Sequence, residues 1–584
     1  MSEMIFGIDL GTTNSCLAVM EAGGPRVIEI EGQPIVPSVV SFDAASGEVI
    51  VGQRARNRLV LEPEATVQSI KRRMGRSERI DFGGRPLLPE EIAAEILRFL
   101  KVQGERACGR EVRRVVITVP AYFGDAQRRA TIRAGELAGL EVARILNEPT
   151  AAALVYDRFE MRGIGSDAAP AGVRRRSAAA DAQRVLVYDL GGGTFDVSVV
   201  EIGGEVNEVR SSCGDNQLGG DDFDLLVTEH FLAQVRERYG HDLGADRRAR
   251  ARLRNAAEQA KIDLSSQPYA RVMEEALAPG LHLDLEIDRT TFESLIQRHL
   301  DSTLGEVDRA LEEAGLSPDR IDRVILVGGS TRIPRIAEML GERFPCPVDH
   351  AVDPALGVAL GAALQGAILG GQVFDQILVD VAAHSLGIKT LDNVFASPFE
   401  RAEADHFSVV IRRNTQIPAA RSEGYFTVVD NQKRVWIEVY QGESELCSRN
   451  TRIGEFSFEL LPAPAGSPVV VEFCYDLDGI IRVVVSQKDK DRRMEVTLST
   501  RTRGESAAAP AGLRPVDNYI LRKARMLADS LPAGPRQDRM REAAAAYEAA
   551  LGRETEDPHE LDRVENELLE LLEEATEEPP DDEP

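Results

Sequence analysis

The pattern of apolar and polar positions changes character twice along the chain. Up to about Gly371, short apolar runs alternate with longer stretches of helical period, which is typical of an α/β architecture. From there to about Ser499 the chain consists of short β-runs separated by turn residues. Residues 515–576 show helical periodicity again. We therefore expect an α/β region, a compact β-domain and a helical segment, in that order.

Two of the apolar runs end in the same way. The first leads into Asp9, a glycine turn and the hydroxyls of Thr12 and Thr13, and the second leads into Asp189, three glycines and Thr194. Each then continues as another apolar strand, so both segments are predicted to be hairpins. Their tips could face one nucleotide from two sides.

The residue types at these tips indicate phosphate and a cation. Bare glycine backbone and a neighbouring hydroxyl can hold phosphate oxygens, whereas Asp189 and Asp196 would repel them unless a cation stood between. The acids therefore imply Mg²⁺. Glycine-rich hairpin turns also occur without ligands, so one copy alone would leave the question open.

A third glycine site follows the strand "RVILV", where Gly328 and Gly329 precede Ser330 and a helical pattern. Such a strand-to-helix turn suits the sugar or base end of a nucleotide. The chain has no Gly-Lys dipeptide, so it lacks the lysine of a Walker-type phosphate loop. Two phosphate hairpins and this turn predict a two-lobed, actin-like ATPase.

Composition narrows the partners. The net charge of -27 argues against a nucleic-acid surface, and the six scattered cysteines form neither a metal motif nor a disulfide framework. The N-terminus shows no export signal, and the apolar run at 355–371 is rich in Ala and Gly, as in a buried helix. We expect a cytoplasmic protein that binds no nucleic acid and no membrane.

Five motifs, in order, carry a family resemblance: "GIDLGTTNS", "VITVPAYFGDAQRRAT", "ILNEPTAAAL", "VYDLGGGTFDVS" and "VILVGGSTRIP". The chain resembles the seventy-kilodalton heat-shock chaperones of the DnaK type over most of residues 4–500. In that family an ATPase domain drives the opening and closing of a β-sandwich that grips extended apolar peptides under a helical lid. The resemblance implies an actin-like ATPase at 1–372, an apolar linker at 373–383, a β-sandwich at 384–503, a short helical lid at 513–576 and an acidic disordered tail at 577–584.

The resemblance also implies roles for individual residues around ATP. Asp9 and Asp189 would organise Mg²⁺, and the family pattern allows K⁺ as a further cofactor. The four positions implied for catalysis are Lys71, Glu148, Thr194 and Asp196. The positions implied for nucleotide binding are Thr12, Thr13, Gly191, Gly192, Gly193, Thr194, Glu258, Lys261, Ser265, Gly328, Gly329, Ser330 and Arg332.

In the β-domain, the family register implies a peptide groove, although apolar strand residues are more often plain core. The groove positions are Ile388, Thr390, Leu391, Tyr425, Val428, Val435 and Ile437.

Within the predicted ATPase domain, the resemblance implies an allosteric relay that also contacts a J-domain, at Pro120, Arg128 and Arg144.

The predicted allosteric linker contains an apolar run, Ile377, Leu378 and Val379, which lies between Asp375 and Asp380. Asp380 is counted as part of this linker. A linker that needed only flexibility would be rich in Gly and Ser. We therefore predict that this run docks in one nucleotide state and is released in the other. The alternative is permanent packing against the β-domain.

Several positions depart from the family pattern. Ala355 stands where an acid is usual near the adenosine, and His384 occurs in an Ala-Ala-His sequence where Thr-Pro-Leu is usual; we assign this histidine no role. The segment between Gly75 and Pro89 is shorter than the family pattern, which indicates a trimmed ATPase subdomain. The segment after Ser266 is also short, which puts the contact with an exchange factor in doubt.

The predicted function is ATP-dependent binding and release of unfolded or client polypeptides, with a J-domain co-chaperone and the further option of a nucleotide-exchange factor. One alternative is an actin-like filament protein or sugar kinase, against which the β-domain argues. Another is a nucleotide-exchange factor, or a specialised single-client chaperone with weak ATPase activity.

Overall fold

The computed structural model describes residues 4–162, 182–203, 206–350, 353–372, 377–390, 405–488, 490, 492–498, 528 and 535–551. The chain divides into two compact units, Met1–Thr500 and Arg501–Pro584. Of the predicted lid at 513–576, the structure describes residue 528 and residues 535–551. The predicted tail at 577–584 and the groove position Leu391 lie outside the described residues. In the second unit, helix α11 (Pro535–Leu551) is described, and Gln537 Nε2 donates a 2.7 Å hydrogen bond to the carbonyl of Ala528.

The first lobe of the N-terminal region is built on a six-stranded sheet of order β11-β10-β1-β2-β3, with β4 paired to β2. Strand β1 pairs in parallel with β10 and antiparallel with β2. The strands are β1 (Ile5–Asp9), β2 (Asn14–Glu21), β3 (Gly24–Val27), β4 (Val36–Pro37), β10 (Arg114–Val119) and β11 (Glu141–Asn147). A three-stranded sheet and a hairpin accompany it: β5 (Val39–Asp43), β6 (Glu48–Val51) and β7 (Thr66–Gln68), then β8 (Ile80–Phe82) and β9 (Arg85–Leu87).

The second lobe has a seven-stranded sheet of order β18-β17-β12-β13-β14-β19-β22. Its strands are β12 (Gln183–Leu190), β13 (Phe195–Gly203), β14 (Val206–Asp215), β17 (Arg323–Val327), β18 (Val348–Asp349), β19 (Ile377–Val381) and β22 (Gln416–Ile417). A separate hairpin, β15 (Tyr269–Ala278) and β16 (Leu281–Asp288), belongs to the same lobe's core.

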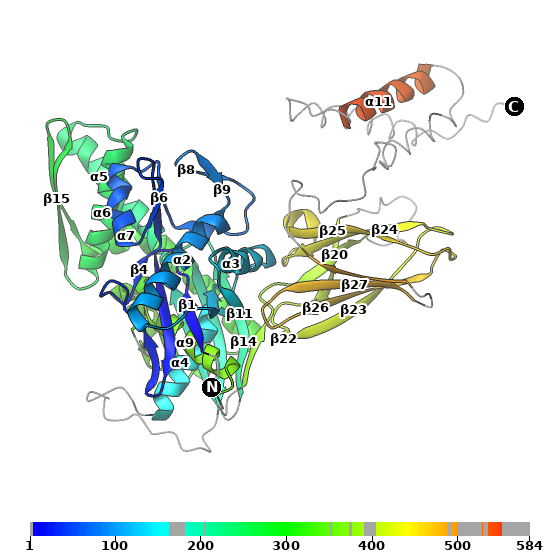
Figure 1. The fold of residues 1–584 in the computed structure, drawn as a ribbon, viewed down its shortest axis with the longest axis horizontal. Coiled ribbons are helices and arrows are strands. Elements are labelled where there is room, and N and C mark those ends of the chain that lie inside the picture. The colour runs from blue at the N-terminus through cyan, green and yellow to red at the C-terminus, as the bar shows by residue number, and fades with distance from the viewer. Residues whose placement is uncertain are drawn as a thin grey trace. The chain divides into compact units, whose positions relative to one another are not determined.

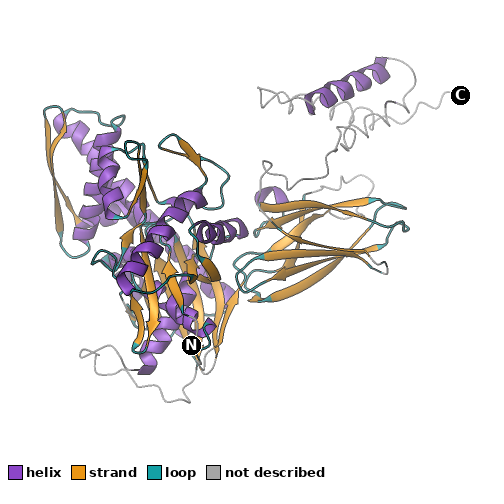
Figure 2. Cartoon of the chain, viewed as in Figure 1, coloured by secondary structure: helices purple, strands orange, loops and turns teal. Residues whose placement is uncertain are grey.

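Helices cover these sheets, as Figure 2 shows in purple around the orange strands. They are α1 (Gln53–Leu61), α2 (Pro89–Cys108), α3 (Asp125–Leu137), α4 (Glu148–Arg162), α5 (Gly220–Tyr239), α6 (Arg247–Leu264), α7 (Arg289–Ala314), α8 (Pro334–Arg343) and α9 (Gly357–Leu369). Short 3₁₀ helices are η1 (Ile70–Arg73), η2 (Pro318–Arg320), η3 (Gly329–Arg332) and η4 (Cys447–Arg449).

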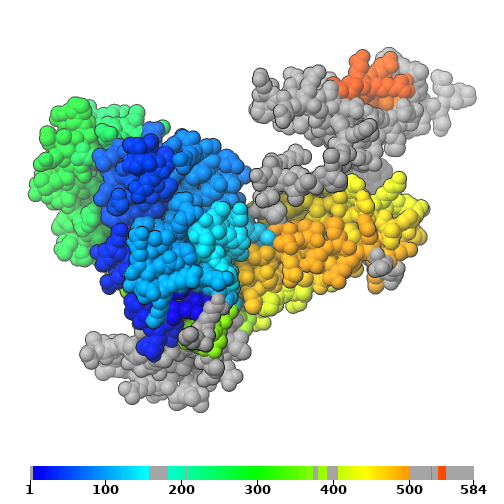
Figure 3. Space-filling model, viewed as in Figure 1, coloured from blue at the N-terminus to red at the C-terminus, as the bar shows by residue number. Residues whose placement is uncertain are grey.

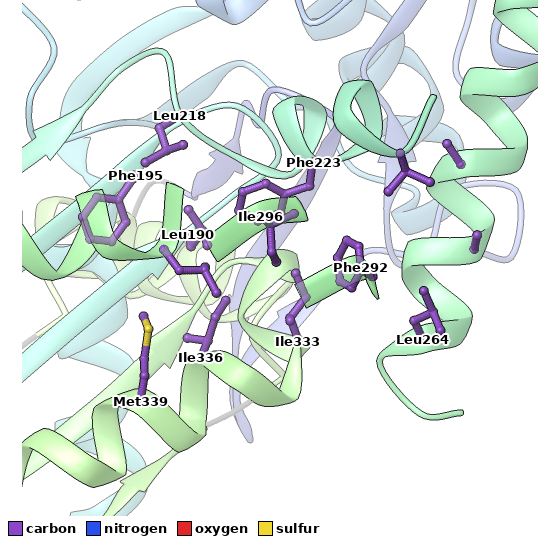
Figure 4. Close-up of a cluster of buried hydrophobic side chains, with 14 of the residues drawn as sticks. Leu190, Phe195, Leu218, Phe223, Leu264, Phe292, Ile296, Ile333, Ile336 and Met339 are labelled. Carbon is purple, nitrogen blue, oxygen red and sulfur yellow. The ribbon is translucent and has the colours of Figure 1, made fainter. Parts of the chain in front are cut away.

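The second lobe's core holds the second glycine hairpin in place. Figure 4 shows Leu190 and Phe195, which flank the glycine turn, among buried side chains that include Phe223 of α5 and Ile336 of α8. Both flanking residues are fully buried, so the apolar ends of β12 and β13 fix where the turn lies.

The Ala- and Gly-rich run forms α9, which is buried along nearly its whole length as predicted. It contacts α4 and strands β1 and β2. The approach is between main chains: a Cβ at Gly7 would lie 2.5 Å from the carbonyl carbon of Ala362, and one at Gly361 would lie 2.5 Å from that of Ala151. Among the described residues, the helices include none that is long and apolar enough to cross a membrane.

The β-domain is a sandwich of two four-stranded antiparallel sheets, as the short β-runs predict (Figure 1). One has the order β21-β20-β24-β25 and the other β23-β26-β27-β28. Gly479, with φ of 73°, lies in the predicted hairpin turn between β26 and β27. The strands are β20 (Leu386–Thr390), β21 (His406–Ile411), β23 (Ala419–Phe426), β24 (Arg434–Gln441), β25 (Thr451–Glu459), β26 (Pro468–Tyr475), β27 (Ile481–Gln487) and β28 (Arg492–Thr497).

Candidate functional site

Two antiparallel hairpins form the centre of the candidate nucleotide site. In the first, β1 and β2 pair Asp9 with Cys16. In the second, β12 and β13 pair Asp189 with Asp196, and the turn is closed by a 3.0 Å hydrogen bond from Gly191 N to the carbonyl of Thr194. One hairpin comes from each lobe's sheet, so the prediction of two glycine hairpins is confirmed.

The hairpin tips touch one another. A Cβ at Gly192 would lie 2.5 Å from Thr13 Oγ1, and a Cβ at Gly193 would lie 2.9 Å from Thr12 Oγ1. Real side chains do not approach so closely, so any larger residue would push the two lobes apart here. The run of glycines is therefore required by the meeting of the tips.

A buried lysine completes the centre of the site. Lys71, on η1, forms an ion pair with Glu148 at the start of α4, and the side chains are 4% and 8% exposed. The carboxyl groups of Asp9, Asp189 and Asp196 lie close enough to interact electrostatically with both. Four acids thus face one ammonium group in a water-poor setting.

The pKa values reflect this imbalance. Burial, with repulsion from Glu148, raises the pKa of Asp9 to about 7 despite a 3.1 Å hydrogen bond donated by Thr118 Oγ1. The same two causes raise the pKa of Asp196 to about 7. Burial also raises the pKa of Asp189 well above its ordinary value, with further repulsion from the neighbouring acids.

Lys71 shows the opposite balance. Burial disfavours its charge, but attraction by Glu148 and Asp9 outweighs burial and raises its pKa. The lysine therefore stays protonated, and the cluster lacks positive charge rather than negative.

The donor set fits a hydrated divalent cation. Asp196 accepts a 3.0 Å hydrogen bond from Tyr122 N at Oδ1, while its Oδ2 is buried with no hydrogen-bond partner. No group of three or more His, Cys, Asp or Glu side chains within the described part of the chain is placed to enclose a metal ion by itself. Mg²⁺ commonly keeps several waters and binds through one or two carboxylates and phosphate oxygens, which matches this arrangement.

The third glycine turn lies against the second hairpin. Gly328 has φ of 83°, and Ser330 Oγ donates a 2.8 Å hydrogen bond to the carbonyl of Gly191. A Cβ at Gly220 would lie 2.6 Å from Ser330 Oγ and 3.0 Å from Lys261 Nζ. Two of the residues predicted to bind adenosine, Ser330 and Lys261, therefore converge beside the second glycine hairpin.

The other predicted adenosine residues are engaged with protein groups. Glu258 forms an ion pair with Arg56, and Ser265 Oγ donates a 3.1 Å hydrogen bond to the carbonyl of Lys261. Arg332 lies 2.7 Å from Asp353 Oδ1, which also accepts a 3.0 Å bond from Ala355 N. The family usually has an acid at the position of Ala355. In this chain the acid Asp353 lies two residues earlier.

Sequence reasoning missed Arg72, the residue after Lys71. Its Nε donates a 2.8 Å hydrogen bond to the carbonyl of Gly193, and its guanidinium pairs with Asp222 at the start of α5. Adjacency to Lys71 is the one signal in the sequence that could have indicated it.

A family model described as Hsp70 protein matches residues 5–82 and 77–583, which together span nearly the whole chain. The chain belongs to the Hsp70 family. The resemblance carried by the five motifs is thereby confirmed, and the chain is a chaperone of the Hsp70 type, a family whose members are ATPases.

In this Hsp70 the apolar linker forms a strand. Strand β19 pairs in parallel with β14, from Val206 with Ile377 to Glu208 with Val379. Its end pairs with β22 of the β-domain, where Asp380 lies opposite Ile417. The linker is thus docked on the N-terminal region's sheet and does not pack against the β-domain alone.

Asp380 is fixed by polar groups of the first lobe. It accepts hydrogen bonds of 2.8 Å from Asn147 Nδ2 and 3.2 Å from Thr150 Oγ1. Asn147 Oδ1 in turn accepts a 2.7 Å bond from Arg128 Nη2. A chain of hydrogen bonds therefore joins the predicted linker residue Asp380 to the predicted relay residue Arg128.

The relay residues border the β-domain. Arg128 also donates to the carbonyl of Phe123, in the loop that follows Pro120, and a Cβ at Gly479 would lie 3.0 Å from Arg128 Cδ. Arg144 precedes Ile145, whose N donates a 3.0 Å bond to Asp478 Oδ1. The structure thus brings Arg128 and Arg144 to the β26–β27 turn.

Further contacts join the same surfaces. Arg129 Nη2 donates a 3.2 Å hydrogen bond to the carbonyl of Ile481, and the cyan surface around α3 meets the orange sandwich in Figure 3. On the second lobe, Arg413 lies 2.6 Å from Glu313, which also accepts a 2.7 Å bond from Asn414 Nδ2.

His384 lies within this contact region. Its Nε2 donates a 3.1 Å hydrogen bond to the carbonyl of Tyr122, and the two rings lie 4.2 Å apart, edge to face. Burial, together with repulsion from the nearby Arg413, Arg128 and Arg309, lowers the pKa of His384 to about 4. A residue to which the sequence assigned no role therefore lies neutral at the junction of two domains.

The predicted groove residues differ in exposure. Ile388 and Ile437 are buried in the sandwich core, while Tyr425 and Val435 pack half-buried against it. Val428 is exposed, and Thr390 is half-buried. Trp436 and Phe426, which are not among the predicted positions, are 62% and 68% exposed beside them.

Proposed function

We propose that this Hsp70 hydrolyses ATP and couples hydrolysis to the binding and release of extended apolar segments of client polypeptides. The observation that carries the proposal is the buried Lys71–Glu148 pair among three further carboxyl groups at the meeting point of two glycine hairpins. Such a surplus of buried acids is costly unless a cation and a phosphate ligand complete the site.

Each residue type has a role in phosphoryl transfer. Bound Mg·ATP supplies the transferred phosphoryl group and the positive charge that the acids lack. Lys71, held by Glu148, places an ammonium group where negative charge grows on the γ-phosphate oxygens. Asp196 Oδ2 has a free acceptor position and can hold a proton of the attacking water. Thr12, Thr13, Thr194 and the backbone of Gly191–Gly193 bind phosphate oxygens.

The coupling runs through β19. The second glycine hairpin, β12–β13, and β14 belong to the same sheet as the linker strand, and Asp380 near the end of that strand is hydrogen-bonded to Asn147, the residue before Glu148. A change at the phosphate site can therefore alter the docking of β19, and the reverse follows from linkage. A J-domain protein would act on the surface around Arg128 and Arg144.

Replacing Lys71 by Ala tests the chemistry. We expect ATP binding to be retained and single-turnover hydrolysis to fall by about tenfold or more, because the lost interaction acts mainly in the transition state. The control is Arg76→Ala, which removes an exposed cation on the same segment. Equal turnover in the two variants would refute the assignment and would favour a nucleotide-exchange factor with little hydrolysis of its own.

A further inference from the structure

The short helix η1 is attached to both lobes. Ile70 and Met74 are buried in the first lobe's core. Arg72, between them, extends the other way and contacts the second lobe. Lys71 lies on the same turn and is joined to Arg72 by one rigid peptide bond, so a displacement of Arg72 also displaces the lysine.

Arg72 binds two parts of the second lobe at once. Its Nε donates to the carbonyl of Gly193 at 2.8 Å, and its Nη1 donates to Asp222 Oδ1 at 3.1 Å, while Nη2 pairs with Asp222 Oδ2. Asp222 also accepts a 2.8 Å bond from Gly219 N and so is itself fixed at the start of α5. The guanidinium thus forms a two-pronged, oriented contact.

Neighbouring bonds act in the same direction. Ser69 Oγ donates to Asp221 Oδ2, and Gln217 Nε2 donates a 3.2 Å bond to the carbonyl of Arg72. The side chains of Arg72 and Asp222 are 16% and 23% exposed, so solvent screens this pair less than a surface ion pair. The contact therefore holds the lobes together more firmly than surface charges would.

We propose that Arg72 is a positioning residue: its contacts with Asp222 and Gly193 close the first lobe onto the second, set the place of Lys71 for hydrolysis, and must open before ADP leaves. This inference rests on the proposed ATPase function. It adds a residue whose loss acts in opposite directions on the two steps, slowing hydrolysis and speeding nucleotide release.

The test compares Arg72→Ala with Arg73→Ala in the full-length protein. Arg73 is the next residue on η1, but it pairs with Glu78 on the exposed side. We expect Arg72→Ala to slow single-turnover hydrolysis about tenfold and to speed dissociation of a fluorescent ADP about tenfold, since the loss of such a charge-assisted pair is of this order. Arg73→Ala should leave both rates within about twofold of wild type.

We call the contacts of Arg72 with Asp222 and Gly193 the clamp. Two further variants distinguish loss of the clamp from an effect on folding. Arg72→Lys keeps the charge without the planar fork and should give intermediate rates. In Arg72→Ala with Asp222→Asn, the two changes should not add, because both remove the same contact. Additive effects, or either rate of Arg72→Ala matching Arg73→Ala, would overturn the proposal.

Failure of the clamp is distinguishable from failure of the ATPase function. If wild type hydrolyses ATP and Lys71→Ala does not, while Arg72→Ala behaves like Arg73→Ala, the clamp alone is refuted. If wild type shows no hydrolysis, the proposed function fails. The clamp is then judged by ADP release alone, where faster release from Arg72→Ala supports it and equal release refutes it.

Discussion

Gly193 shows how narrowly single residues define the proposed phosphate site. Its Cα faces Thr12 of the other hairpin and the Arg72 side chain, and a Cβ would lie 2.7 Å from Arg72 Nε. The sequence motif predicted a bare backbone for the sake of a phosphate. The structure adds a second reason, which is contact between two lobes.

We expect Gly193→Ala to weaken ATP binding by about tenfold or more without unfolding the protein, because relief of overpacking requires the hairpins to separate. Isothermal titration with ATP and Mg²⁺ measures the affinity, and circular dichroism checks the fold. Gly341→Ala is the control, since a Cβ on that helical glycine meets no atom within 4 Å. Unchanged affinity in Gly193→Ala would show that the tips tolerate separation.

His384 predicts an effect of pH on docking of the β-domain. Its pKa is lowered from 6.5 to about 4 in the docked state, so the released state binds a proton first as pH falls below 6.5. Docking is therefore fully favoured above pH 6.5 and weakens between pH 6.5 and 4. At pH 5.5 the docked-to-released ratio should fall about tenfold.

Energy transfer between dyes on the two domains measures this ratio from pH 7.5 to 5.5. The charged groups that influence His384 most are Arg413, Arg128 and Arg309. His384→Leu should remove the pH dependence while keeping an apolar contact with Tyr122. A profile that persists in His384→Leu would assign the effect to other groups.

At the scale of elements, hairpins and strands followed from local patterns. Apolar runs that end in acid, glycine and threonine predicted both glycine hairpins, and Asp478-Gly479 predicted the β26–β27 turn, because each pattern lies within a few consecutive residues. The docking of β19 was predicted only in outline. Its partner β14 lies about 170 residues earlier in the chain, and no local pattern encodes such a pairing.

Replacing Ile377, Leu378 and Val379 with Gly-Ser-Gly should abolish coupling while leaving basal hydrolysis measurable. A flexible segment loses more entropy on joining a sheet, so β19 should stay released. The measurements are stimulation of the ATPase by an apolar peptide and release of that peptide by ATP. A control with Val-Ile-Ile at these positions should behave as wild type. Peptide release at the wild-type rate from the Gly-Ser-Gly variant would contradict the role of the strand.

At the scale of the whole molecule, periodicity predicted α/β structure followed by β-structure, and helix α11 is the described helix of the predicted helical segment. The contacts of Arg72 with Asp222, and of His384 with Tyr122, could not be predicted. They join segments 150 and 262 residues apart, and their geometry depends on how whole lobes and domains meet. The motifs thus indicated residues that the structure brings together, such as Lys71, Glu148 and Asp196, but not the residues that connect the lobes and domains.

Removal of residues 501–584 should leave the first unit folded and its basal ATPase intact. The sandwich core is formed within that unit, by residues between Ala382 and Leu498. If the helical segment acts as a lid, a fluorescent apolar peptide should dissociate about tenfold faster from the truncated protein. Removal of 577–584 alone should leave the peptide dissociation rate unchanged. Equal rates for both truncations would show that the helical segment does not retain clients.

The close main-chain approach of α9 to β1 and α4 affects how the lobes can move relative to one another. Where long side chains interlock, two bodies can move past one another only by repacking, but at Gly7 and Gly361 α9 meets β1 and α4 main chain to main chain, beside the packed side chains of Val358, Leu360 and Leu364. At these two glycines no side chain has to repack when the helix shifts. Small displacements of the lobes at these contacts of α9 therefore require no repacking of side chains. Enlarging Gly361 would hinder such displacements without changing any residue that we propose to bind the nucleotide.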